Sequence, residues 1–451
     1  MLRKLDHSGV TTTKNRRKYI RVSTPKICGT RLLFKLDYSR KLKAYFSSDY
    51  FYVEYDEDID DVDESILYIP VVSALIPFAW ATSADIYVRK LDKTFLESLT
   101  KVKMVMKKWW PRLPFSTKVN VEEVILNRSS GIKYGLLFSG GIDSTTSYIR
   151  HRDKKPNLIM IHGADVPLSK KEFWRKIKIV YESFAKEEGV DINFIKTNMR
   201  QLLNEKLLDA EFGRYGSDLS WWGSFYHGIA LLGLCAPLTI AKHIGILLIA
   251  STHTHKFKYP WGSHPLIDEN ISWAGVKVIH DGYNLSRQEK IRYILKRFIN
   301  DSGRYPPLRV CYSQFRHFNC DRCIKCYRSI IGLTLEGIDP NKCGFNVDSK
   351  FFATLKRDFI KGKLKLDDDN FFFFRDIQEH IPEKLDHDLY HSKEFFEWFK
   401  DYDLRRNYKK HRIKNLVPLS LYRIYYGLPK SFQSAISHLE HSILLRIKKS
   451  A

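Results

Sequence analysis

The sequence contains no uninterrupted apolar run long enough to cross a lipid bilayer. Its longest run extends from Gly228 to Ala241 and is broken by Pro237, whereas a spanning helix needs roughly 20 apolar residues. The first 21 residues are polar and basic and lack the apolar core of a secretory signal. These absences argue against a membrane or secreted protein, so we expect a cytoplasmic one.

Acidic residues are scarce relative to basic ones. Asp and Glu number 51 against 75 Lys and Arg, which gives a formal net charge of +24. Such a surplus favours polyanionic partners, among them nucleotides, nucleic acid or an acidic protein. A solvated, lysine-rich surface without a specific partner explains the surplus equally well, and the composition leaves both interpretations open.

Cysteines are few, and most of them are gathered in one place. Four of the seven lie within sixteen positions: Cys311, Cys320, Cys323 and Cys326. In an intracellular chain this clustering indicates metal binding rather than disulfides. Four thiolates leave no open coordination position, so a structural zinc site is predicted, with an iron-sulfur cluster or buried reduced thiols as alternatives.

The length of 451 residues suggests two or three domains. Strand-like alternation from Arg31 to Val53 and helical periodicity from 93 to 110 indicate an α+β N-terminal domain without a catalytic signature. The predicted organisation is a basic flexible arm over 1–22, the α+β domain over 23–130, an α/β domain with the four-cysteine zinc site over 131–345 and a helical region over 346–451, ending in a basic amphipathic helix.

Apolar strands alternate with helices in the third of these segments. The expected strands are 134–138, 158–162, 192–196, 244–250 and 276–280, and the helices between them are 144–151, 169–188, 199–209 and 220–243. This alternation is typical of a parallel sheet covered on both faces. We therefore expect an α/β fold with a doubly wound, five-stranded parallel sheet.

A glycine-rich loop, Ser139-Gly140-Gly141-Ile142-Asp143-Ser144-Thr145, joins the first strand to its helix. Adjacent glycines let the backbone turn sharply and bring N–H groups close to an anion, and the helix N-terminus adds further donors. The three hydroxyls suit phosphate oxygens, and Asp143 either orients the loop or holds Mg²⁺. Neither the Walker lysine nor the G-x-G-x-x-G fingerprint is present. A strand-to-helix turn without a ligand is the alternative.

The segment FSGGIDSTTSY resembles the SGGxDS signature of the pyrophosphate-loop ATP pyrophosphatases. That superfamily includes asparagine and GMP synthetases, tRNA thiolases and 7-cyano-7-deazaguanine synthase. The resemblance implies that ATP is split to AMP and pyrophosphate, with AMP transferred to a substrate oxygen and then displaced by a nucleophile. It implies ATP contacts along the loop and catalytic roles for Ser139, Asp143 and Ser144. Asp165 and Arg287 are candidate contacts to adenosine and pyrophosphate, with a turn cap and a surface charge as their alternatives.

The loop and the cysteine quartet together are similar to 7-cyano-7-deazaguanine synthase (QueC) over about 133–340. The loops expected to bind the substrate depart from that family, because only Tyr259 and Pro260 remain of its Gly-Tyr-Pro-Asp-Cys-Arg loop. With the terminal extensions, this pattern is similar to the QueC-like proteins of antiviral defence islands (Qat and type IV CBASS). Candidate substrate contacts, with packing or plain loop residues as the alternative, are Tyr226, His253, His255, Tyr259, His264 and Asp268.

The implied activity is ATP-dependent carbon-nitrogen ligation. The implied substrate is a 7-deazaguanine carboxylate, and the acceptor is ammonia or the amine of a partner protein. Two further functions stay open: tRNA modification such as thiolation, and an inactive nucleotide-binding subunit of a defence complex. Thiolation is disfavoured because Cys28, Cys235 and Cys343 form no catalytic pair. The intact loop argues against a loss of catalysis.

Overall fold

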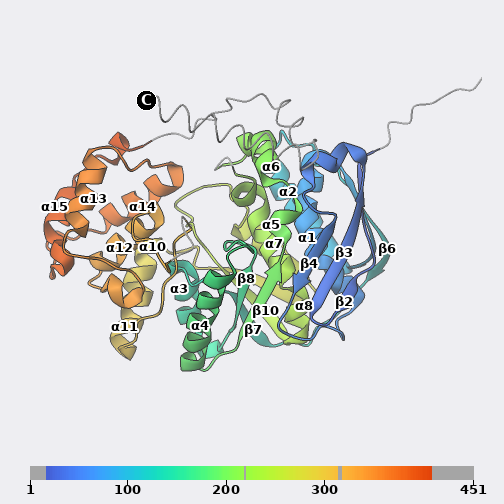
Figure 1. Cartoon of the computed structure of the whole chain (residues 1–451), viewed down its shortest axis with the longest axis horizontal. Helices are drawn as coiled ribbons and strands as arrows, with labels where there is room; N and C mark the ends of the chain where they lie inside the picture. The colour runs from blue at the N-terminus through green and yellow to red at the C-terminus, as the bar shows by residue number, and fades with distance from the viewer. Residues whose placement is uncertain (1–16, 218–219, 313–316, 409–451) are drawn as a thin grey trace, which may run out of the picture.

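Strand β1 (Tyr19–Val22) is the first element of the computed structural model, which describes residues 17–217, 220–312 and 317–408 (Figure 1). Ile20 and Val22 point into the core from β1. The flexible arm predicted over 1–22 therefore extends too far, because its last residues alternate in exposure as a half-buried strand does. Residues 1–16 and the predicted basic helix at the C-terminus lie outside the described residues.

A single mixed sheet of twelve strands runs through the described part of the chain. Its order is β11-β12-β10-β7-β8-β9-β4-β3-β1-β5-β6, with β2 paired to β3. The remaining strands are β2 (Lys26–Cys28), β3 (Arg31–Tyr38), β4 (Tyr50–Glu54), β5 (Asp85–Asp92), β6 (Val119–Ile125), β7 (Lys133–Leu137), β8 (Asn157–His162), β9 (Ile192–Thr197), β10 (Ile244–Ala250), β11 (Ser272–Trp273) and β12 (Val276–Asp281).

The five predicted strands are β7, β8, β9, β10 and β12, and adjacent members of this set pair in parallel. The sheet is nevertheless larger than predicted, and it is mixed. Strand β4 pairs antiparallel with β9 through Val53 and Thr197, and β11 pairs antiparallel with β12. The prediction of a five-stranded, purely parallel sheet was wrong because β9 is not an edge strand. Strand β4 of the N-terminal segment pairs with the edge of β9 that faces away from β8.

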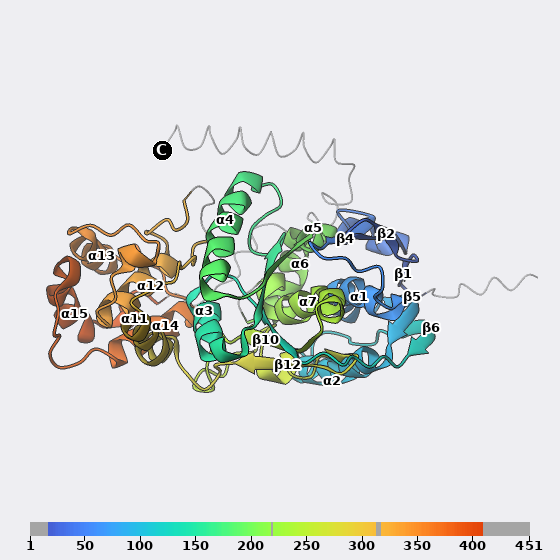
Figure 2. The same cartoon turned by 90° about the horizontal axis from the view of Figure 1, so that it is seen from below.

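Helices cover both faces of the parallel strands, as predicted (Figure 2). Leu136 packs with α3 (Ile142–Arg150) and α4 (Lys171–Glu188) on one face. The adjacent Leu137 belongs to the core on the other face, which contains α1 (Glu64–Thr82) and α7 (His227–Leu234). Successive strand residues thus point to opposite faces and are buried on both.

Helix α1 is apolar on all sides because protein surrounds it. Two helices, Glu64–Thr82 and Trp222–Ala241, do have the length and composition of membrane spans, so the expectation that no stretch is long enough was wrong; 100% and 78% of their apolar windows are buried inside the structure. Core helices of folded proteins have the same properties. The core around α1 contains residues on both sides of position 130, so the sheet and the core both cross the predicted domain boundary.

The C-terminal helices form a lobe at the opposite end from the N-terminal strands (Figure 1). This lobe has its own apolar core, to which Cys311 and Cys326 belong. The remaining helices are α2 (Lys93–Trp109), α5 (Met199–Leu202), α6 (Glu205–Phe212), α8 (Ala236–Ala241), α9 (Pro265–Asp268), α10 (Arg287–Lys290), α11 (Lys296–Ser302), α12 (Ile324–Leu335), α13 (Phe351–Ile360), α14 (Asp368–Glu379) and α15 (Lys393–Lys400).

Candidate functional site

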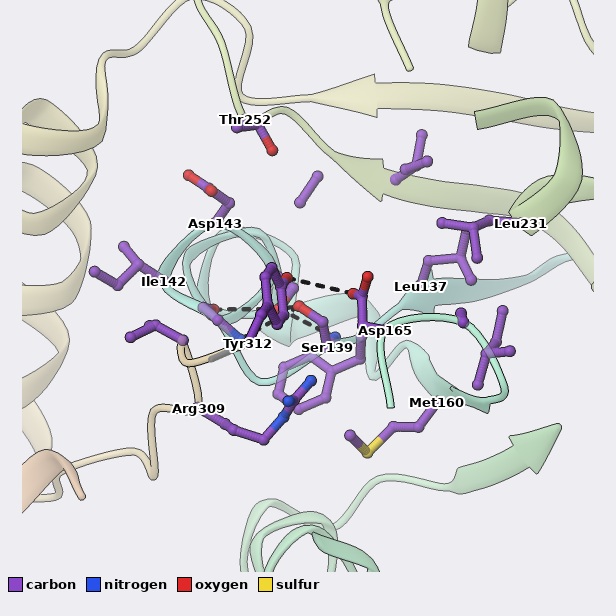
Figure 3. Close-up of a pocket in the computed structure, with 18 of the residues that line it drawn as sticks. Leu137, Ser139, Ile142, Asp143, Met160, Asp165, Leu231, Thr252, Arg309 and Tyr312 are labelled. Carbon is purple, nitrogen blue, oxygen red and sulfur yellow. Dashed lines mark hydrogen bonds between the residues drawn. The ribbon is translucent and has the colours of Figure 1, made fainter. Parts of the chain in front are cut away.

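A cavity of about 180 Å³ opens at the carboxyl ends of β7, β8 and β10. Strand β7 lies between β8 and β10. From β7 the chain continues to β8 and β9 on one side of the sheet, and it later forms β10 on the other side of β7. Such a reversal of strand order leaves a crevice in which open α/β sheets bind ligands. Ser139, Asp143 and Asp165 line the cavity, and so do residues from the C-terminal side of the chain (Figure 3).

The glycine-rich loop forms the floor of this cavity between β7 and α3. The Ser139 and Ser144 hydroxyls lie 3.2 Å apart, and the Gly141 N–H donates to Ser139 Oγ over 3.4 Å. Gly140 has a φ of +75°, and a Cβ atom there would lie 1.8 Å from the Tyr181 hydroxyl. Glycine is therefore required at 140, both by backbone conformation and by close packing.

Asp143 is held by two cations. Arg287 Nη2 lies 2.5 Å from one carboxylate oxygen, and Lys290 Nζ lies 3.2 Å from the other. Burial alone would raise the pKa of Asp143, but Arg287 and Lys290 outweigh it and bring the pKa down to about 2. Lys290 also donates to the Ser251 carbonyl, so this buried ammonium ties the loop to the end of β10.

Three further cations line the cavity, and sequence reasoning did not assign them to it: Arg309, Lys325 and Arg328. Arg309 and Arg328 are only 3% and 5% exposed. Within the described residues, Nε and Nη1 of Arg309, Nε of Arg328 and the Thr145 hydroxyl have no hydrogen-bond partner. Burial, followed by the nearby Arg328, lowers the pKa of Lys325 to about 8. The only sequence signal was their position around the cysteines.

Polar and apolar groups occupy different parts of the cavity wall. Asp165 accepts a hydrogen bond from the Tyr312 hydroxyl over 3.3 Å, and the Lys325 ammonium lies 3.5 Å from the Tyr312 ring centroid. Apolar side chains from β7, β8, β10 and α7 form the rest of the wall: Leu137, Ile159, Ile161, Leu231 and Ile249. Figure 3 shows Leu137 and Leu231 on the opposite side of Asp165 from Asp143 and Arg309, so the cavity has one apolar end and one cationic end.

The predicted substrate residues lie around the cavity rather than on its wall. His253 Nε2 lies 2.6 Å from Asp369 Oδ1, and Asp268 pairs with His280 in the core. The Tyr226 hydroxyl donates to the Met199 carbonyl. The other three lie elsewhere in the same loops: His264 caps α9, Tyr259 stacks on Phe257, and His255 is exposed. Their neighbours His227 and Thr252 do line the cavity.

The four clustered cysteines converge as predicted. Their sulfur atoms all lie within 4.8 Å of one another, with Cys323 Sγ 3.5 Å from Cys326 Sγ and 3.9 Å from Cys311 Sγ. The Cys323 N–H donates to Cys320 Sγ over 3.2 Å, as in a turn wrapped around a metal. These spacings suit tetrahedral thiolate ligands at about 2.3 Å from a central ion, so the cluster could hold a metal such as zinc.

The cysteine cluster and the cavity are connected by short stretches of chain. Tyr312 directly follows Cys311, while Lys325 and Arg328 flank Cys326 on the first turns of α12. Placement of the cysteines therefore also places a ring and two cations on the cavity wall. No family model, curated protein or solved structure matches this chain, so its function is inferred from these groups themselves.

Proposed function

We propose that the cavity binds ATP and that the protein adenylates a carboxylate, which an amine then attacks. The observation that carries this proposal is the set of buried guanidinium donors, Nε and Nη1 of Arg309 and Nε of Arg328, which have no partner among the described residues and belong to side chains that line the cavity together with the glycine-rich loop. An unpaired buried cation is costly, and a polyphosphate supplies the acceptors that would pair it. Four cations against two carboxylates on the wall favour an anion further.

The two ends of the cavity match the two parts of a nucleotide. The apolar end accommodates a planar base, while Ser139 and Ser144, which line the cavity, face the phosphates at the cationic end. In the reaction a carboxylate oxygen attacks the α-phosphorus, and the bond from that phosphorus to the bridging oxygen of pyrophosphate breaks. The electron pair leaves with pyrophosphate, whose charge Arg309 and Arg328 stabilise without reorganisation.

An amine then attacks the activated carbonyl carbon and expels AMP. By resemblance, the acyl group belongs to a 7-deazaguanine-like base, and the amine is ammonia or belongs to a partner protein. We propose accordingly that the enzyme acts in the cytoplasm, in antiviral defence. Nucleic acid is a further candidate partner because of the net charge of +24.

The carboxylate of Asp143 does not fit the role of a Mg²⁺ ligand as it is arranged. Both of its oxygens are already bound by cations, and a metal ion would have to displace Arg287 or Lys290. We therefore assign Asp143 to orienting those two side chains.

The cysteine cluster fits zinc, whose role would be structural because four thiolates fill its coordination sphere. The ion would fix the segments that carry Tyr312 and Lys325 on the cavity wall. None of the three cysteines outside the cluster lines the described cavity, and burial raises the pKa of Cys343 to about 12. This placement supports ligation over thiolation, for which an accessible, ionisable thiol is needed.

Pyrophosphate release tests the proposal. Purified protein is incubated with ATP and 7-carboxy-7-deazaguanine, and pyrophosphate is measured for wild type, Ser139→Ala and Ser183→Ala. Ser183 is an exposed helix residue that hydrogen-bonds Glu187, so its replacement is a matched control. We expect release from wild type and the control and a loss of at least tenfold in Ser139→Ala. Equal release from all three would refute the proposal. Tight ATP binding without turnover would favour an inactive nucleotide-binding subunit.

A further inference from the structure

Helix α14 of the C-terminal lobe packs against α10 and α12, the two helices that carry Arg287 and Arg328. Its Asp376 accepts a hydrogen bond from the Gln288 N–H over 3.0 Å, which fixes the first turn of α10. Asp369 and Phe373 of α14 both contact Arg328, which lines the cavity. Neither lines the cavity, and no sequence motif pointed to either of them.

Asp369 joins two groups at the edge of the cavity. Its Oδ1 lies 2.6 Å from His253 Nε2, next to the cavity-lining Thr252, and its Oδ2 lies 3.3 Å from Arg328 Nη1. Asn370 Oδ1 accepts from the same Arg328 nitrogen over 3.1 Å. With Nη1 bound to α14, the Nε of Arg328 remains unpartnered among the described residues. The arginine is thus held by one side and offers the other to a ligand.

Phe373 contacts both arginines. The guanidinium carbons of Arg287 and Arg328 each lie 4.1 Å from the centroid of its ring. Two guanidinium groups this close to one ring repel each other, which is costly in a buried site without an anion. The negative face of an aromatic ring and the Asp369 carboxylate both offset that repulsion. Helix α14 therefore acts together with Asp143, which pairs with Arg287, to stabilise these two neighbouring cations.

We propose that Asp369, with Phe373, is a positioning residue supplied by the C-terminal lobe, which holds Arg328 and Arg287 in place for the terminal phosphates of the nucleotide. The inference rests on the proposed function, since it names how that same site recognises a polyphosphate. Under this proposal two parts of the chain build the site. The α/β part supplies the glycine-rich loop and the apolar end, and α14 fixes the positions of Arg287 and Arg328. Loss of Asp369 is expected to weaken phosphate recognition and to leave base recognition unchanged.

Calorimetric titration of the full chain with ATP, adenosine and inorganic tripolyphosphate tests this inference. The variants are Asp369→Asn and, as a control, Asp368→Asn, which changes the same charge on the exposed neighbouring residue. A hydrogen bond to a charged group corresponds to a change of about tenfold or more in affinity. We expect Asp369→Asn to raise the dissociation constants of ATP and tripolyphosphate about tenfold. The adenosine constant should stay unchanged, and Asp368→Asn should behave as wild type.

Equal weakening of ATP and adenosine would show a merely structural role and overturn the inference, as would an unchanged tripolyphosphate constant. Should Asp369→Asn fail to fold, Phe373→Leu provides the same comparison, with an expected weakening of about fivefold for tripolyphosphate. Failure of the proposed function has a different signature. Wild type would then bind tripolyphosphate in an Asp369-dependent way and release no pyrophosphate from ATP. A wild type that binds no phosphate ligand would overturn both.

Discussion

Replacement of Asp143 by Asn removes the carboxylate that joins Arg287 to Lys290. The Asp143 side chain is 16% exposed, and its pKa falls from 3.8 to about 2 on folding. Since a tenfold change in proton affinity corresponds to about 1.4 kcal/mol, the ionised carboxylate contributes about 2 kcal/mol to the free energy of unfolding at neutral pH. Removal of the carboxylate also leaves two buried cations without their partner, and the loss of one partner of a buried ion pair usually lowers the free energy of unfolding by about 3–5 kcal/mol. Arg287 keeps its contact with Phe373, so we expect about 3 kcal/mol.

The pH dependence of this loss follows from the direction of the pKa change. Because the folded pKa lies below the unfolded value, the stabilisation is complete above about pH 4 and disappears as the pH falls towards 2. Urea denaturation of wild type and Asp143→Asn should therefore differ most near pH 7 and converge in acid. Asp301→Asn, at an exposed helix pair with Arg297, should cost less than about 0.5 kcal/mol at any pH. A difference for Asp143→Asn that is equally small at pH 7, or that does not change with pH, would refute the reasoning.

Three further predictions concern the cavity and the cysteine cluster. The purified protein should contain one zinc ion per chain by elemental analysis, and Cys323→Ser should lower both the zinc content and the melting temperature; full stability without metal would contradict this. Gly140→Ala should lower the melting temperature and abolish ATP binding in calorimetry, because its methyl group would overlap Tyr181; a variant that binds ATP normally would show that the loop is not the phosphate site. Arg309→Gln should weaken ATP binding at least tenfold and leave the melting temperature unchanged or higher, because Nε and Nη1 of this buried guanidinium have no hydrogen-bond partner among the described residues. A lower melting temperature would mean that the guanidinium already has its partners in the protein.

Local patterns predicted the central strands and the position of the glycine-rich loop between β7 and α3 well. Strand β10 was expected over 244–250 and has these bounds, because an apolar run between helices specifies a buried parallel strand. The helix expected over 199–209 is in fact two, α5 and α6. Leu203 between them has an extended backbone, and the Asn204 side chain caps the second helix. Asparagine is a common N-cap residue. The helical periodicity nevertheless continues across Asn204, so the break between the two helices was not predicted.

Long-range placement is what the local patterns could not supply. The pairing of β4 with β9 joins residues more than 140 positions apart. The sequence of neither strand indicates which other strand it pairs with. For the same reason, Arg309 and Arg328 could not be assigned to the cavity from the sequence. Phe373 is one of four consecutive phenylalanines, and its contact with Arg287 and Arg328 depends on the packing of α14. The candidate site was therefore predicted on its loop side only.

The pairing of β4 with β9 determines what can be removed from this molecule. A chain begun at residue 131 would keep the pairing of β9 with β8 but would open the other edge of β9, and it would uncover the face of α7 that α1 now buries. Open strand edges and apolar faces drive self-association. Residues 17–130 therefore protect the parallel strands from aggregation, and we expect the shortened chain to precipitate even though every residue of the glycine-rich loop is retained.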